Sequence, residues 1–167
     1  MRTSFLILLF LALPAFAGGS ALPDGWRKPT AEELQDGWRN DCPGRCAQIT
    51  ADFDGKGLAE GAFLAIHEKR KVMGLLAFVH TAQGNAQWFV LDEIKDPASI
   101  AVMGVQLYSP GTYKMMCAES EKQCGPDGKR PFDFRLPAIS YFKSESASSV
   151  FYWNERDRKF ERIWESD

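Results

Sequence analysis

The sequence predicts a mainly β protein, an antiparallel sandwich or open barrel with one short N-terminal helix. Two observations lead to this fold class. Beyond Arg45, apolar and polar residues alternate with the two-residue period of half-buried strands. The periodic runs are short, and brief turns rich in Gly, Pro, Asn and Asp separate them. About eight to ten such strands are expected to pack as antiparallel sheets around one core.

Residues 1–17 have the three parts of a secretory signal peptide. A basic start is followed by an apolar run over residues 5–13, and Ala15 and Ala17 are the small residues of a cleavage site. The run is too short for a transmembrane helix, which needs about 20 apolar residues. We therefore expect a periplasmic or secreted protein that is not membrane-embedded, with residues 18–167 as its mature chain.

The mature chain is expected to begin with a linker over residues 18–29, where Pro and Gly disfavour regular structure. Thr30 and Glu33 then have the spacing of a capping box, which predicts a short helix from Thr30 to about Arg39. Residues 30–167 are expected to form a single β-rich domain, because this length suits one hydrophobic core and not two.

The strands follow in chain order. Periodic runs predict them at residues 47–53, 62–67, 72–81, 87–91, 100–107, 112–117, 132–136, 139–143, 150–154 and 160–164. The second and third runs are expected to form a hairpin across a charged turn, which places His80 opposite about Glu60. The last two runs form another hairpin, which gathers their aromatic side chains on one face.

Four cysteines lie in the mature chain: Cys42, Cys46, Cys117 and Cys124. An even count in an exported protein predicts disulfide bonds, and four cysteines allow three pairings. We favour the local pairs, because a Pro-Gly turn separates the first two cysteines and a polar loop separates the last two. A four-thiolate zinc site is the alternative, although the C-x2-C spacing typical of such sites is absent.

The stretch Asp52-Phe53-Asp54-Gly55-Lys56-Gly57-Leu58-Ala59-Glu60 connects two predicted strands. It resembles the Asp-rich calcium loops of FG-GAP/VCBS-type proteins. The resemblance implies Asp52, Asp54 and Glu60 as Ca²⁺ ligands, since this hard cation binds six to eight oxygen atoms. Lys56 departs from the pattern, because it stands where these loops carry a third Asp or Asn. Two interpretations stay open, a Ca²⁺ site and a metal-free turn in which Lys56 neutralises the carboxylates. We favour the second and expect no cofactor.

Further segments, Tyr108–Lys114, Glu145–Trp153 and Trp164–Asp167, resemble small exported bacterial proteins of uncharacterised function. Together with the acidic loop, the resemblance covers residues 45–167. It implies no activity.

Composition and motifs exclude several functions. The formal net charge is −2, and removal of Arg2 with the leader takes it to −3. Without a basic cluster, nucleic acid is a poor partner. The sequence contains no P-loop, dinucleotide-binding fingerprint, H-E-x-x-H or G-x-S-x-G motif. We therefore expect no catalytic residues and no enzymatic activity.

The leading hypothesis is a non-enzymatic binding module that acts through contacts with a protein partner. An inhibitor or immunity-type protein directed against an envelope-acting enzyme fits a small, exported, disulfide-bonded domain. One alternative is a Ca²⁺-stabilised envelope domain that binds glycan or cell-wall material through its C-terminal aromatic residues. Another is an unrecognised hydrolase centred on His80 and the acidic loop.

Overall fold

The computed structural model describes residues 21–117, 124–125 and 127–166. The signal peptide expected over residues 1–17 lies outside the described residues. Within the described ranges, no helix is long and apolar enough to cross a membrane.

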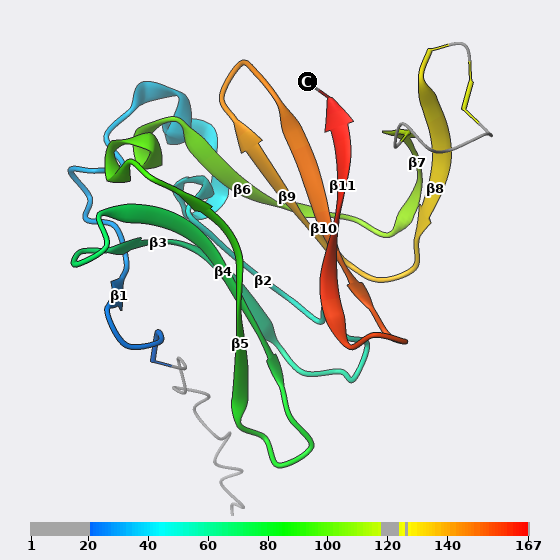
Figure 1. The fold of residues 1–167 in the computed structure, drawn as a ribbon, viewed down its shortest axis with the longest axis horizontal. Coiled ribbons are helices and arrows are strands. Elements are labelled where there is room, and N and C mark those ends of the chain that lie inside the picture. The colour runs from blue at the N-terminus through cyan, green and yellow to red at the C-terminus, as the bar shows by residue number, and fades with distance from the viewer. Residues whose placement is uncertain (1–20, 118–123, 126, 167) are drawn as a thin grey trace, which may run out of the picture.

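The strands of the described residues form three antiparallel sheets (Figure 1). A five-stranded sheet has the order β1-β3-β4-β5, with β2 also paired to β3, and a four-stranded sheet has the order β11-β10-β9-β6. The third sheet is the hairpin β7–β8. The bounds are β1 Trp26–Arg27, β2 Gln48–Ala51, β3 Glu60–His67, β4 Val72–His80, β5 Ala86–Ile94, β6 Met103–Tyr108, β7 Gly111–Met116, β8 Lys129–Phe134, β9 Ala138–Lys143, β10 Ser148–Asn154 and β11 Lys159–Ser166.

The main hydrophobic core lies between the five-stranded and the four-stranded sheets. Leu64 of β3 pairs with Leu75 of β4, and both side chains are fully buried against the other sheet. Val105 and Ile139 of the four-stranded sheet complete this contact and are also fully buried. The structure therefore confirms the mainly β fold that the alternating sequence predicted. The antiparallel sheets are not closed into a barrel.

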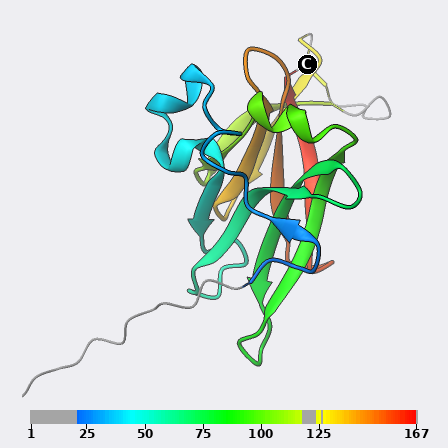
Figure 2. The same ribbon diagram turned by 90° about the vertical axis from the view of Figure 1, so that its left-hand side faces the viewer.

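The outer faces of the two large sheets are covered unequally. The hairpin β7–β8 packs on the four-stranded sheet, where Met115 and Phe134 bury themselves against Ala138 and Val150. On the outer face of the five-stranded sheet, the Trp26 ring lies over Gly74 of β4, and Figure 2 shows residues 21–28 in blue in front of the strands. The outward-facing residues at the centre of this face, Ala65, Leu76 and Phe78, are buried.

The prediction of a helix from Thr30 to Arg39 is wrong. The helices among the described residues are short 3-10 helices: η1 (Gly37–Asp41), η2 (Pro43–Cys46) and η3 (Pro97–Ala101). Both capping-box bonds form, from Thr30 N to Glu33 Oε2 (2.8 Å) and from Glu33 N to Thr30 Oγ1 (3.2 Å). The next amides, however, bond three residues back. Asp36 is extended, with ψ 132°. A helical nucleus costs free energy, and one interrupted turn is too short to recover it.

The predicted linker also differs from expectation, because Trp26 and Arg27 form strand β1. Trp26 pairs with His67 and Arg27 with Ile66. The Trp26 ring lies directly over Gly74 of β4, where any Cβ atom would approach within 2.5 Å of the ring. Part of the linker is therefore fixed to the sheet.

The disulfides are the local pairs, Cys42–Cys46 and Cys117–Cys124. This confirms the favoured pairing, and no cysteine among the described residues is free to bind zinc. The C-terminal aromatic residues are only partly packed together, and Trp164 is 43% exposed. Trp153 and Phe160 contact each other at 5.2 Å between ring centroids, and Phe89 of β5 packs against both.

Candidate functional site

The acidic loop is organised around Glu60, the first residue of β3, whose side chain is fully buried. Its Oε2 accepts hydrogen bonds from the backbone amides of Phe53 (3.0 Å) and Asp54 (3.2 Å). Its Oε1 accepts one from the amide of His80 (3.0 Å). Burial raises the pKa of Glu60 to about 6, with a smaller contribution from the charge of Asp54. Glu60 thus ties the loop to the end of β4.

The three predicted ligands do converge, with one carboxylate oxygen from each of Asp52, Asp54 and Glu60 lying within 4.8 Å of the others. Donors of the chain already bond at least one oxygen of each carboxylate, and Asp52 Oδ1 is buried without a hydrogen-bond partner. The Lys56 ammonium pairs with Asp54 Oδ2, and the amide of Gly57 donates to Asp52 Oδ2 at 2.8 Å. Both oxygens of Glu60 accept backbone bonds. Ca²⁺ would have to displace these donors, so the loop does not fit the ion as it stands.

His80 contacts the same loop, but not through a carboxylate. Its ring nitrogens lie 3.2 Å from the Ala59 carbonyl oxygen and 3.3 Å from that of Gly84. A neutral imidazole can donate to only one of these two acceptors. His80 therefore contacts Glu60 through the backbone amide of His80. The hydrolase hypothesis required a contact between the imidazole ring and the carboxylate.

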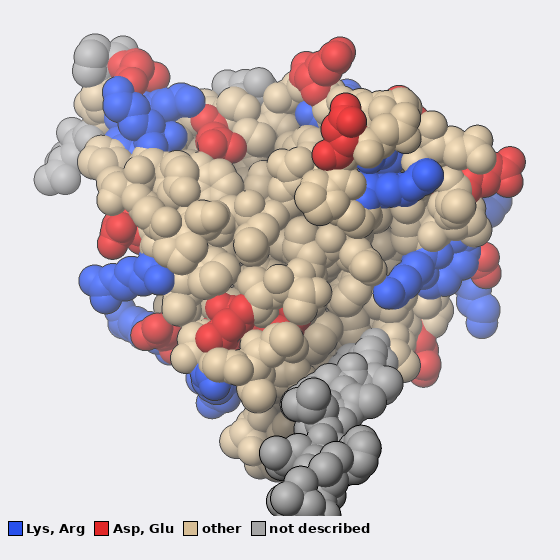
Figure 3. Space-filling view, turned by 180° about the vertical axis from the view of Figure 1, so that it is seen from behind, with Lys and Arg blue, Asp and Glu red and all other residues tan. Residues whose placement is uncertain are grey.

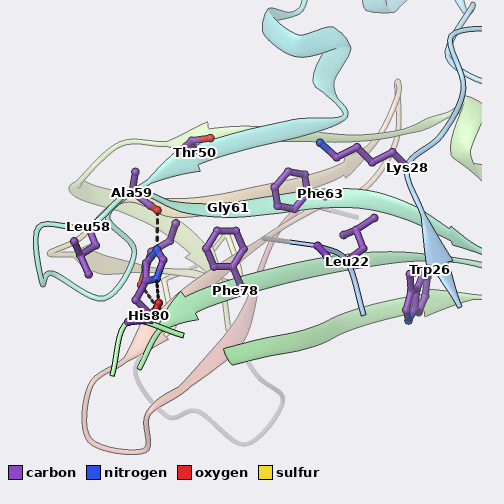
Figure 4. A pocket seen from close by; sticks show the side chains of 13 residues that line it. Leu22, Trp26, Lys28, Thr50, Leu58, Ala59, Gly61, Phe63, Phe78 and His80 are labelled. Atoms are coloured by element: carbon purple, nitrogen blue, oxygen red, sulfur yellow. Dashed lines mark hydrogen bonds between the residues drawn. The ribbon is translucent and has the colours of Figure 1, made fainter. Parts of the chain in front are cut away.

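Beside His80, the outer face of the five-stranded sheet contains a groove of about 910 Å³. We call it the aromatic groove. Phe63 and Phe78 form its floor, His80 lies at one end, and Lys28 and Trp26 lie at the other (Figure 4). The residues that line it are Ala21, Leu22, Trp26, Lys28, Thr50, Leu58, Ala59, Glu60, Gly61, Phe63, Phe78, His80 and Gly84.

Strand periodicity explains the floor. Ala62 and Leu64 of β3 point into the core, so their neighbours Gly61 and Phe63 point outward. On β4, Phe78 is opposite Gly61, and its ring stacks on Phe63 with centroids 6.2 Å apart. Gly61 makes room for both rings, because a Cβ atom there would lie within 2.5 Å of Phe63 and 2.8 Å of Phe78. Trp88 of β5 supports the Phe78 ring at 5.0 Å.

This groove was not predicted from the sequence. Phe63 and Phe78 lie in predicted strands, but the sequence does not indicate which face of these strands the second sheet covers. A signal was present, because β4 is apolar on both faces from Val72 to Val79. Such a run is typical of a strand whose two sides both contact apolar groups. Lys28 and Trp26 were missed because they fall in the expected linker.

Charged groups do not gather into a field of one sign on the face seen in Figure 3, where both signs are interspersed around a broad uncharged centre. No family model matches the sequence, and no curated protein or solved structure shows significant similarity to the chain.

Proposed function

We propose that this chain is an exported, non-enzymatic binding module that holds a segment of a partner protein in the aromatic groove. It would act as an inhibitor or immunity-type protein against an envelope-acting enzyme. The observation that carries the proposal is the groove of about 910 Å³ on the outer face of one sheet, lined by Phe63 and Phe78, while the corresponding face of the other sheet is covered by its own hairpin. A groove lined by apolar and aromatic side chains is typical of a binding site.

The size and chemistry of the groove support a binding role. A volume of about 910 Å³ lies in the range of sites that hold drug-sized ligands or a few side chains of a protein segment. Phe63 and Phe78 line the groove with rigid rings, and aromatic side chains contribute strongly at protein interfaces. Leu58, 43% exposed, extends the apolar surface at the rim. A partner side chain placed there would bury apolar area on both molecules.

Two local disulfides support action outside the reducing cytosol. An inhibitor needs only a rigid surface that complements its target. The floor of the groove meets this requirement because it is built on paired strands and fixed by Gly61, while β1 anchors one wall. Preorganisation of this kind reduces the entropy lost on binding.

The test compares three forms of the mature protein as bait for envelope proteins of the source organism: the unmodified chain, Leu58→Asp and Leu107→Asp. Leu58 lines the groove, whereas Leu107 is 49% exposed on β6 outside it. The two substitutions therefore add the same charge to similarly exposed leucines. We expect one enzyme to bind the unmodified chain and Leu107→Asp, and to bind Leu58→Asp about tenfold more weakly or not at all.

The purified partner should then lose activity when titrated with the unmodified chain and keep it with Leu58→Asp. Equal binding by Leu58→Asp would contradict the assignment of the groove. Loss of binding in Leu107→Asp alone would move the contact to the crevice between β2 and β6, where Leu107 lies.

A further inference from the structure

The aromatic groove offers a positive charge next to its floor and no accessible negative charge among its lining residues. Lys28 extends toward Phe63, with its ammonium 4.9 Å from the ring centroid (Figure 4). Glu60 is the one acidic residue of the lining. Both of its oxygens face inward and accept backbone bonds, and the residue is fully buried. A bound segment therefore meets the ammonium without a competing carboxylate.

The ammonium of Lys28 is held in place but not neutralised. Its hydrogen-bond partner is the amide oxygen of Gln48, at 3.3 Å, and no carboxylate of the described residues forms an ion pair with it. The neighbouring Arg27 differs, because it bonds Glu33 at 2.8 Å and Glu68 at 2.7 Å. Glu33 and Glu68 are thus paired with Arg27, and the charge of Lys28 is left available to a ligand in the groove.

We propose that the partner segment carries a carboxylate that pairs with Lys28, next to a large apolar side chain that packs on Phe63 and Phe78. This rests on the proposed function and specifies the partner. The charge complementarity follows from Lys28, and the apolar requirement follows from the aromatic floor. An ammonium held over a ring can bind a carboxylate from the open side while keeping its contact with the ring.

A random peptide library displayed on phage tests this without knowledge of the partner. The mature chain is immobilised in five forms: unmodified, Lys28→Met, Lys28→Glu, Leu58→Asp and the control Lys143→Met. Methionine keeps an apolar stem of similar length and removes the charge. Lys143 is an exposed lysine at the end of β9, on the other sheet.

We expect peptides selected on the unmodified chain to combine Asp or Glu with an aromatic or large aliphatic residue. Their affinity should fall about tenfold in Lys28→Met and stay unchanged in Lys143→Met. Selection on Lys28→Glu should enrich Lys or Arg in place of the acidic residue. Added salt should weaken binding to the unmodified chain and have much less effect on Lys28→Met, because screening acts on the ion pair.

The outcomes separate the two proposals. Peptides that need Leu58 but show no acidic preference, with equal affinity for Lys28→Met, would overturn the Lys28 inference and leave the groove as the binding site. Peptides that bind Leu58→Asp as well as the unmodified chain would overturn the proposed function. If no peptide is selected and dodecanoate displaces 1-anilinonaphthalene-8-sulfonate from the groove, the ligand is a lipid, and both proposals are wrong.

Discussion

Lys56 determines the chemistry of the acidic loop at the scale of single residues. Its ammonium pairs with Asp54, whose side chain is almost fully buried, and stands where the resemblance to calcium loops requires an oxygen ligand. An opposite charge near a buried carboxylate favours its ionised form, and in this loop Lys56 supplies that charge to Asp54. The carboxylates therefore stabilise a turn, and that turn forms one end of the aromatic groove.

Replacing Lys56 with Asp should convert this turn into a metal-dependent one. With EDTA, Lys56→Asp should lose about 1–3 kcal/mol of unfolding free energy, because the buried Asp54 carboxylate loses its partner and gains a like charge nearby. Millimolar Ca²⁺ should restore the melting temperature of Lys56→Asp and leave that of the unmodified protein unchanged. The measurement is thermal melting in EDTA and in Ca²⁺, with Lys95→Asp as control. A Ca²⁺-dependent rise in the unmodified protein would show that Lys56 does not block the site.

Glu60 should give the protein a distinct pH dependence of stability. Its pKa rises on folding from an ordinary value of 4.5 to about 6, so the native state binds the proton more tightly than the unfolded chain. Its contribution to stability is therefore fully present below about pH 4.5 and is lost as pH rises through about 6. The loss amounts to about 2 kcal/mol.

Urea unfolding at several pH values from 4 to 7.5 measures this effect by comparison with Glu60→Gln, which does not titrate. The stability difference between the two proteins should shift by about 2 kcal/mol in favour of Glu60→Gln between pH 4 and 7.5, with the steepest change between about pH 4.5 and 6. Glu155→Gln, at an exposed glutamate, is the matched control. A difference that stays constant with pH would mean that Glu60 is not perturbed by burial.

At the scale of elements, Arg39 explains how a segment without a helix keeps its position. The residue is fully buried and donates to the carbonyl oxygens of Arg45 (2.7 Å), Ile100 and Met103. It thereby connects η1 and η2 to η3 and to the start of β6. Burial lowers the pKa of Arg39 to about 10, and the guanidinium is still charged at neutral pH.

Substitution of Arg39 by Met should destabilise the protein strongly. Three carbonyl groups would lose their donor, two of them deep in the structure, so we expect a loss of about 3 kcal/mol of unfolding free energy. Arg39→Lys should be intermediate, because one ammonium cannot reach all three acceptors. Arg45→Met, which removes one partly buried hydrogen bond to the Leu34 carbonyl oxygen, should cost less, about 1 kcal/mol. Urea unfolding measures all three, and a loss below about 1 kcal/mol for Arg39→Met would refute the anchoring role.

Elements were predictable where a repeated local pattern specifies them. The strands from β2 to β11 follow runs of alternating residues, and their existence was correctly predicted. The capping box at Thr30 and Glu33 was misleading, because its hydrogen bonds form equally well in an isolated turn. Strand β1 has two residues, too few to show any period. Its place is set by Trp26 packing on Gly74, a contact between residues far apart in the sequence.

For the whole molecule, periodicity indicates which residues face a core but not which strands lie side by side. The sequence therefore predicted antiparallel sheets without their order, and it could not show that β7–β8 covers the outer face of one sheet and not that of the other. The acidic loop was predictable because its residues are contiguous. The aromatic groove was not, because Lys28, Phe63 and Phe78 meet only after β1, β3 and β4 have paired.

The two disulfides have a mechanical consequence. They span sequence separations of only 4 and 7 residues, and neither links one sheet to another. A force that pulls the chain from its ends would separate every sheet with both S–S bonds intact. The two disulfide-closed loops would shorten the fully extended chain by only about 40 Å. Resistance to stretching therefore comes almost entirely from strand pairing and core packing. An oxidised molecule pulled through a narrow pore would therefore pass as an extended chain that carries two small disulfide-closed loops.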